Sequence, residues 1–248
     1  MVDPSNDKKS IRVFDLMEIA ASIRGLAKTC ASMEDLAQET TQHLYNQLTV
    51  DPSGEPACAL VRFFHTVEYA QLETRLQELA RATTGNLRAE DKCLTLLGTS
   101  GSEERWNQRQ TSLSHQVMPL LSPDMVAQSP MIARLLTQLG IEISSLFRAE
   151  RRHPNFLAPA EQDYNIFYVP EAQDSPYIPA KEEFVLPYGI KSVIGYGSML
   201  PSGELFAVVM FFRILIPEEV TQRFTALALS TMIACLQIAP KTIFHEFE

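Results

Sequence analysis

Apolar residues three and four positions apart predict helices at both ends of the chain. They mark one helix over residues 11–29 and a second helix that begins after Ser32. Asp35 follows Ser32 at the spacing of a capping box, which supports a helix start there. A last helix is expected from Pro217 to about Ile238, because a proline followed by acidic residues suits a first helical turn.

Continuous apolar runs between these helices predict strands. The segment ACALVRFFHT, residues 57–66, is apolar over most of its length, as in strands that are buried on both faces. Shorter apolar runs and further one-sided helical spacings follow it. We expect strands at 93–97, 117–121 and 164–169, and helices at about 68–83 and 130–139.

Two strand-like segments near the C-terminus form the clearest local pattern. Residues 190–199 and 204–213 are joined by Leu-Pro-Ser-Gly, and proline and glycine at these turn positions favour a tight connection. This pattern predicts a β-hairpin. A sheet that contains a hairpin, with helices at both chain ends, indicates an α+β fold rather than a parallel doubly wound sheet.

The segment from Ser102 to Gln116 has no apolar period and is rich in charged and amide side chains. Long irregular segments inside compact domains usually serve binding or are mobile. We therefore expect this loop to be the most mobile internal segment and to border a binding cleft.

The charge of the chain limits its partners. The formal net charge is −9, and the acidic residues are spread along the sequence. The only basic cluster is Arg148, Arg151, Arg152 and His153, for which a solvated turn is the favoured interpretation because a proline follows. Since nucleic-acid binding needs a clustered basic face, we expect small molecules or proteins as partners.

The cysteines and the apolar stretches indicate the compartment. Cys30, Cys58, Cys93 and Cys235 lie far apart, without the spacing of a metal site, as in a reducing compartment. The N-terminus has no signal-peptide pattern, and the uncharged stretch 224–240 is too short and too polar to span a membrane. We therefore expect a cytoplasmic protein without a membrane partner.

Four short motifs follow one another in the C-terminal half of the chain. They are Gly189-Ile190-Lys191-Ser192, the turn Pro201-Ser202-Gly203, the strand Glu204 to Met210 and the helix from Pro217. Together they resemble the second half of a GAF domain. The earlier segments CLTLLGTSG, HQVMPLLSPDMV and SPMIARLLTQLG are similar to GAF-like sensor modules found ahead of bacterial histidine kinases and cyclases. The resemblance covers about residues 32–238.

This resemblance implies a fold and a division of the chain. It implies a six-stranded antiparallel sheet with a ligand-sized cleft on one face and helices from both chain ends packed on the other. The expected parts are a disordered N-terminus (1–10), an N-terminal helix (11–31), a GAF-like sensory domain (32–240) and a tail (241–248). GAF domains bind cyclic nucleotides, tetrapyrroles, haem, metabolites or nothing, so the fold names no ligand.

The favoured function is a sensory or regulatory module of bacterial signalling that binds a small molecule and has no catalysis of its own. The sequence contains no nucleophile elbow, P-loop or HExxH motif. The alternative is a dimerisation or protein–protein interaction module without a ligand. A cysteine-dependent GAF-type methionine sulfoxide reductase is disfavoured, because Cys58 and Cys93 are flanked by apolar residues. A signalling protein is a further expected partner.

Aromatic and polar residues in the loop and the hairpin are the candidates for a ligand site. His115 is a candidate anion or haem ligand, with an exposed loop histidine as the favoured alternative, and the absence of a Cys-His dipeptide argues against a covalent bilin. Trp106 either caps a ligand or anchors the loop, and the tyrosines bind either a ligand or backbone. The candidates are Trp106, His115, Tyr177, Tyr188, Ser192 and Tyr196.

The last predicted helix is apolar nearly all round. Such a helix has to be buried on more than one side. We expect it to pack with the first helix into a two-fold dimer bundle, and the alternative is that the first helix covers it within one monomer. The expected dimer interface is Leu229, Met232, Ile233 and Leu236.

Overall fold

A six-stranded antiparallel sheet lies at the centre of the computed structural model, which describes residues 13–50, 53–112, 114–147, 165–178, 180–239 and 241–245. The strand order is β3-β2-β1-β6-β5-β4, so the first and last parts of the domain meet at the central pair β1 and β6. The strands are β1 (Cys58–Glu68), β2 (Lys92–Gly101), β3 (Val117–Pro119), β4 (Ile166–Val169), β5 (Ser192–Met199) and β6 (Leu205–Phe212).

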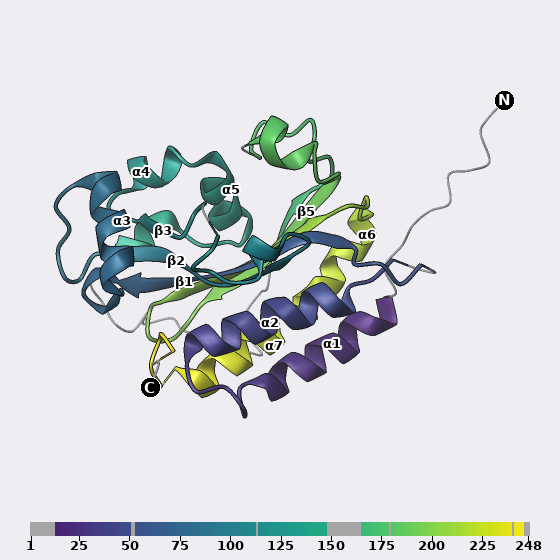
Figure 1. The fold of residues 1–248 in the computed structure, drawn as a ribbon, viewed down its shortest axis with the longest axis horizontal. Coiled ribbons are helices and arrows are strands. Elements are labelled where there is room, and N and C mark those ends of the chain that lie inside the picture. Colours follow the sequence, from purple (N-terminus) through teal and green to yellow (C-terminus); the bar gives the residue numbers. More distant parts are fainter. Residues whose placement is uncertain are drawn as a thin grey trace.

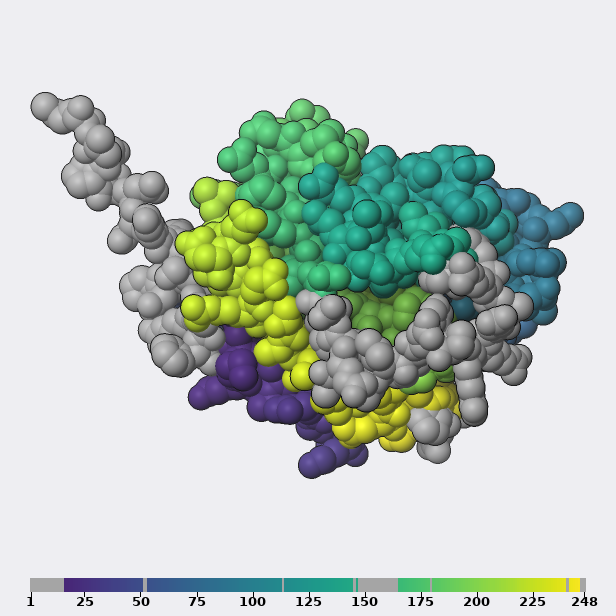
Figure 2. All heavy atoms as spheres, turned by 180° about the vertical axis from the view of Figure 1, so that it is seen from behind, coloured from purple at the N-terminus to yellow at the C-terminus, as the bar shows by residue number. Residues whose placement is uncertain are grey.

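Helices cover both faces of this sheet. Three long helices, α1 (Val13–Leu26), α2 (Met33–Gln47) and α7 (Thr225–Ile238), lie together on one face, and α4 (Pro123–Ala127) and α5 (Pro130–Gln138) lie on the other (Figure 1). Seen from behind, α1 and α7 again lie below the segments that cover the opposite face (Figure 2). The remaining helices are η1 (Tyr69–Gln71), α3 (Thr74–Thr84), η2 (Glu104–Trp106), η3 (Ile143–Phe147), η5 (Lys181–Val185), α6 (Glu218–Thr221) and η6 (Gln222–Phe224).

The central strands are apolar on both sides because each face meets a different layer. In β6 every residue is buried, and successive side chains alternate between the two main cores. Phe206, Val208, Met210 and Phe212 face the three long helices. Leu205, Ala207, Val209 and Phe211 face the opposite layer.

The helix face of the sheet is closely packed. A Cβ atom at Gly98 of β2 would lie 2.3 Å from the backbone carbonyl carbon of Ala37 in α2, so only glycine permits this approach. The predicted capping box fixes the start of the same helix. The Asp35 N–H donates to the Ser32 hydroxyl, and the Ser32 N–H donates to the Asp35 carboxylate.

The structure confirms the α+β class and the hairpin, with several shifted boundaries. Strand β2 extends to Gly101, beyond the predicted end, because its polar second half remains paired with β1. The helix predicted from residue 68 begins only at Thr74, since Leu72 is extended after the short helix η1. The predicted basic cluster at 148–153 and the N-terminal ten residues lie outside the described part of the chain.

The helix α7 is covered by α1 within the same chain, which was the alternative to a dimer bundle. Met232 is fully buried in this intrachain core, so the prediction that it forms a dimer interface is corrected. Leu229, Ile233 and Leu236 are half-buried, and their part in a dimer stays a prediction. No helix among the described residues has the length and apolar character needed to cross a bilayer.

Candidate functional site

A cavity of about 560 Å³ lies between the sheet and the layer that contains α5 and η5. Its floor consists of side chains from the central strands β1 and β6, together with Leu94 of β2. Helix α5 and residues 176–188 cover it, and the loop between β2 and β3 closes one side. The volume lies within the range of sites that hold small molecules and cofactors.

Aromatic side chains form one wall of this cavity. The ring of Trp106 lies 4.5 Å from that of Tyr188 and 5.6 Å from that of Phe184, between ring centroids. Phe184 in turn packs edge-on against Phe211 of β6 at 5.1 Å. These rings come from three separate segments, so the wall exists only in the folded chain.

A buried arginine forms the polar part of the cavity floor. Arg62 lies on the central strand β1 and is 7% exposed. Its Nη2 donates to the hydroxyls of Ser112 (3.0 Å) and Ser114 (3.2 Å), and its Nη1 donates to the Ser114 carbonyl (3.3 Å). None of the ion pairs found among the described residues involves it. Burial lowers the pKa of Arg62 to about 10.

The loop carries His115 to the same place. His115 lines the cavity with φ = 58°, a left-handed conformation that is uncommon for a residue with a side chain. Gln116 holds this turn, because its side-chain amide donates to the carbonyls of Arg109, Gln110 and Ser112. His115 is exposed, as the alternative interpretation expected, but partial desolvation of the ring and the nearby Arg62 cation both lower the pKa of His115.

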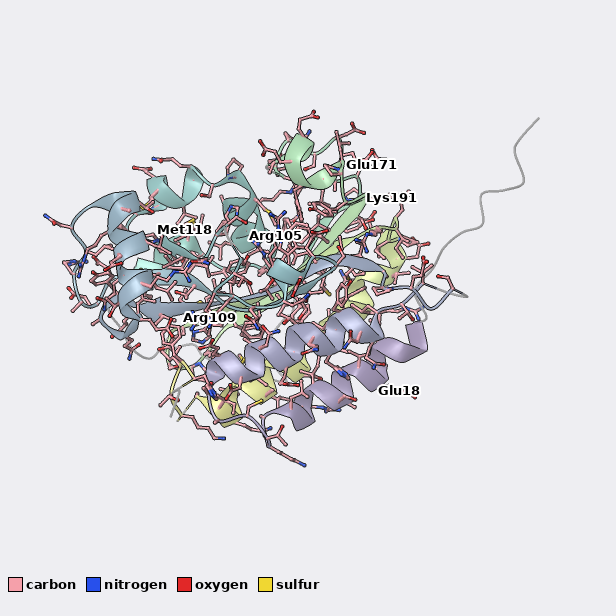
Figure 3. All side chains as sticks on the ribbon, viewed as in Figure 1. Glu18, Arg105, Arg109, Met118, Glu171 and Lys191 are labelled. Carbon is pink, nitrogen blue, oxygen red and sulfur yellow. The ribbon has the colours of Figure 1, made fainter. Side chains whose placement is uncertain are left out.

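A second buried arginine holds the middle of the loop. Arg109 is 5% exposed and donates to Glu34 of α2 (2.9 Å from Nη2) and to Glu73 (2.7 Å). Figure 3 shows Arg109 close to the start of α2, whereas Arg105 of the same loop lies on the cavity side of the sheet. The loop therefore borders the cleft as expected, but it is anchored on both faces of the sheet.

The structure brings four of the six predicted site residues together. Trp106, His115, Tyr177 and Tyr188 line the cavity. Tyr177 also lies under the Arg134 guanidinium, 4.0 Å from the ring centroid. Whether these four residues bind a ligand stays a prediction.

The other two candidates lie on the helix face, which corrects their predicted place. The Tyr196 hydroxyl is fully buried against the Thr231 hydroxyl of α7, at 3.2 Å. The Ser192 hydroxyl donates to the Ile214 carbonyl. Their neighbours Gly195 and Val193 face the other way, because side chains alternate along a strand.

The sequence interpretation missed Arg62. Its signal was present, because a charged residue in an apolar strand buried on both faces has no solvated position. Phe184 and Phe211 were also missed, and no local pattern distinguishes them from ordinary core residues.

The described residues contain no group of three or more His, Cys, Asp or Glu side chains that could hold a metal ion. The four cysteines are free and buried. Cys93 lies opposite Val67 at the far end of β1 from Cys58, so the two thiols are roughly 30 Å apart. Burial raises the pKa of Cys93 to about 12 and also raises the pKa of Cys58.

Comparison with known proteins gives structural relatives only. No protein-family model matches the chain. No curated protein sequence matches it either. The structure is similar to that of a free methionine-R-sulfoxide reductase from Neisseria meningitidis, with a TM-score of 0.51 and 10% identity over 93% of this chain and 94% of that chain.

Two further matches are to GAF domains, at TM-scores below 0.5 that carry no argument about this chain. One is a structure of a GAF domain, at a TM-score of 0.45 and 12% identity over 97% of this chain and 94% of that one. The other is the phycoerythrobilin-bound GAF domain of a cyanobacterial phytochrome, at a TM-score of 0.45 and 11% identity over 91% of this chain and 96% of that one. At such identities a match concerns the fold alone.

The arrangement of the layers decides the fold. The six antiparallel strands have helices from both chain ends on one face and a ligand-sized cavity on the other, as the sequence resemblance implies. The chain has a GAF-like fold. In this GAF-like chain the cavity lies on the face that the terminal helices leave free, and its walls come from the connection of β2 to β3, from helix α5 and from the connection of β4 to β5.

Proposed function

We propose that this GAF-like chain is a sensory or regulatory module that binds a small molecule in the sheet-face cavity. The observation that carries the proposal is the cavity itself, about 560 Å³ in volume and lined mainly by apolar and aromatic side chains with a few polar groups. Soluble domains usually fill such a space with side chains, because empty volume lowers stability. A retained cavity of this size therefore favours a ligand.

The proposal includes no catalysis by the chain itself. A nucleophilic cysteine needs an accessible, electropositive surrounding, whereas the four cysteines here are buried. Free buried cysteines also support a reducing, cytoplasmic location. The likeness to a reductase in fold adds no argument for that activity, because no cysteine lines the cavity.

A neutral dye tests the proposal without assuming the chemistry of the ligand. We expect Nile red to bind the purified protein at one site and to quench Trp106, the only tryptophan, which lies in the cavity wall. The variant Ala207→Leu extends a buried side chain of the cavity floor into the cavity and should abolish binding. Ala21→Leu places the same change on the exposed side of α1 and should leave binding unaltered.

The opposite result supports the alternative, an interaction module without a ligand. Nile red that fails to bind, or that binds Ala207→Leu as well as wild type, would sink the cavity proposal. Native mass spectrometry of the same samples gives a second measurement. A small molecule that co-purifies with wild type and with Ala21→Leu, but not with Ala207→Leu, is the expected result.

A further inference from the structure

Arg62 is a buried cation that has no counter-charge among the residues the structure describes. The guanidinium is 7% exposed, and its hydrogen-bond partners among the described residues are two hydroxyls and one carbonyl, all of them neutral. Its Nε atom is buried without a hydrogen-bond partner in the described part of the chain. A buried cation is normally paired with a carboxylate, since removal from water disfavours the charge.

Two polar neighbours of Arg62 also line the cavity. Arg62 itself, Ser114 and His115 all line it. The Ser114 hydroxyl accepts from Arg62, so its own proton remains free to be donated. Glu183 is the acidic residue of the lining, but it is exposed and does not pair with Arg62. Among the described residues, the polar end of the cavity thus presents hydrogen-bond donors and no buried carboxylate.

We infer that the ligand of this cavity is an apolar, ring-bearing or acyl molecule with one carboxylate, which Arg62 binds. This inference rests on the proposed function and specifies its ligand. The carboxylate supplies the missing counter-charge at Arg62 and accepts from Ser114 and His115. The apolar body packs against the aromatic wall of Trp106, Phe184 and Tyr188.

The charge balance favours a carboxylate over a phosphate monoester. One unpaired cation matches one negative charge, whereas a phosphate monoester carries about −1.5 to −2 at neutral pH. Three donor bonds of Arg62 are already used by the protein, which leaves Nε–H and one Nη1–H for the ligand. The second cation of the lining, Arg105, is exposed and remains hydrated.

Three probes of one shape test the charge of the ligand. They are 1-naphthaleneacetate, its neutral amide and 1-naphthylmethyl phosphate, each titrated against Trp106 fluorescence and against bound Nile red. We expect wild type to prefer the carboxylate over the amide by about 10–100-fold, because a charge-assisted hydrogen bond forms in a desolvated site. Arg62→Gln should remove this preference, and Nile red that still binds the variant shows that it is folded.

Arg105→Gln is the matched control, because it makes the same change at an exposed arginine of the same cavity. We expect it to retain most of the preference for the carboxylate. Equal binding of carboxylate and amide, a preference that survives Arg62→Gln, or tightest binding of the phosphate would each overturn the inference while Nile red still binds. Loss of all binding, Nile red included, would instead refute the proposed function.

Discussion

Two buried arginines contact the loop between β2 and β3, one from strand β1 and one from within the loop, and they are paired in opposite ways. Arg109 contacts Glu34 and Glu73, and although burial alone would lower its pKa, the hydrogen bonds and charges of these carboxylates raise it. Among the described residues Arg62 contacts neutral groups of the loop and no carboxylate, and burial lowers its pKa to about 10. The two side chains are almost equally buried, so their partners make the difference.

Under the proposed function, this difference separates a structural site from a ligand-binding site. The ion pair at Arg109 ties the loop to α2 and to the start of α3, and it is complete within the protein. The site at Arg62 is incomplete and opens on a cavity. Perturbed ionisable groups in a cleft are candidates for functional sites, and this is the basis for the carboxylate proposed as the partner of Arg62.

The largest expected effect is at Arg109. Arg109→Met leaves the Glu34 carboxylate, 8% exposed, without its cation, and we expect the free energy of unfolding to fall by about 3–5 kcal/mol. Chemical denaturation measures this directly. Adding Glu34→Gln to the variant should restore part of the loss, because the unpaired charge is then gone. A loss below about 1 kcal/mol would show that the pair is no anchor.

A third basic residue, His65, tests whether burial itself disfavours charge in this sheet. It lies on β1, 3% exposed, and burial lowers its pKa to about 4. The unfolded chain takes up the proton near pH 6.5 and the folded chain does not, so stability falls as the pH drops through this window. The expected loss from this one residue between pH 7 and pH 4 is about 2–3 kcal/mol.

The measurement is the pH dependence of denaturation of wild type beside His65→Gln. Carboxylates and other histidines titrate in both proteins, so the difference between the two curves isolates His65. Curves that stay parallel from pH 7 to pH 4 would contradict the lowered pKa of His65.

The smallest effect is expected at Arg62. Arg62→Met removes a charge that no carboxylate compensates, so it leaves no buried charge behind, only the Ser112 hydroxyl. We expect the free energy of unfolding of the empty protein to change by less than about 1 kcal/mol. Denaturation of Arg62→Met beside Arg109→Met makes the comparison quantitative. Equal losses in the two variants would mean that both arginines are structural.

The sequence predicted the layers of this protein well. Apolar runs predicted the buried strands, and apolar residues three and four positions apart predicted the long helices, because both patterns indicate which faces of an element avoid water. The motif at Gly189 and the hairpin turn carried the resemblance to the GAF fold. The loop was also correctly expected to border the cleft, and four candidate residues met there.

Only the tertiary structure decided which side of each strand faces the cavity. Ser192 and Tyr196 differ from Val193 and Gly195 by one position, and a sequence alone does not say which alternating set faces the helices. The same holds for α7. Its apolar sequence requires burial on more than one side, and only the structure shows that α1 of the same chain covers it.

The partners of the two arginines show the same limit. Glu34 lies 75 positions from Arg109, and Ser112 lies 50 positions from Arg62. Local spacing carries no information about such contacts, because they form only when the loop crosses from the α2 face of the sheet to the cavity. The sequence therefore determined that Arg62 lies in an apolar strand and Arg109 in a polar loop. Packing decided that carboxylates of the protein neutralise Arg109, and that no carboxylate of the described residues neutralises Arg62.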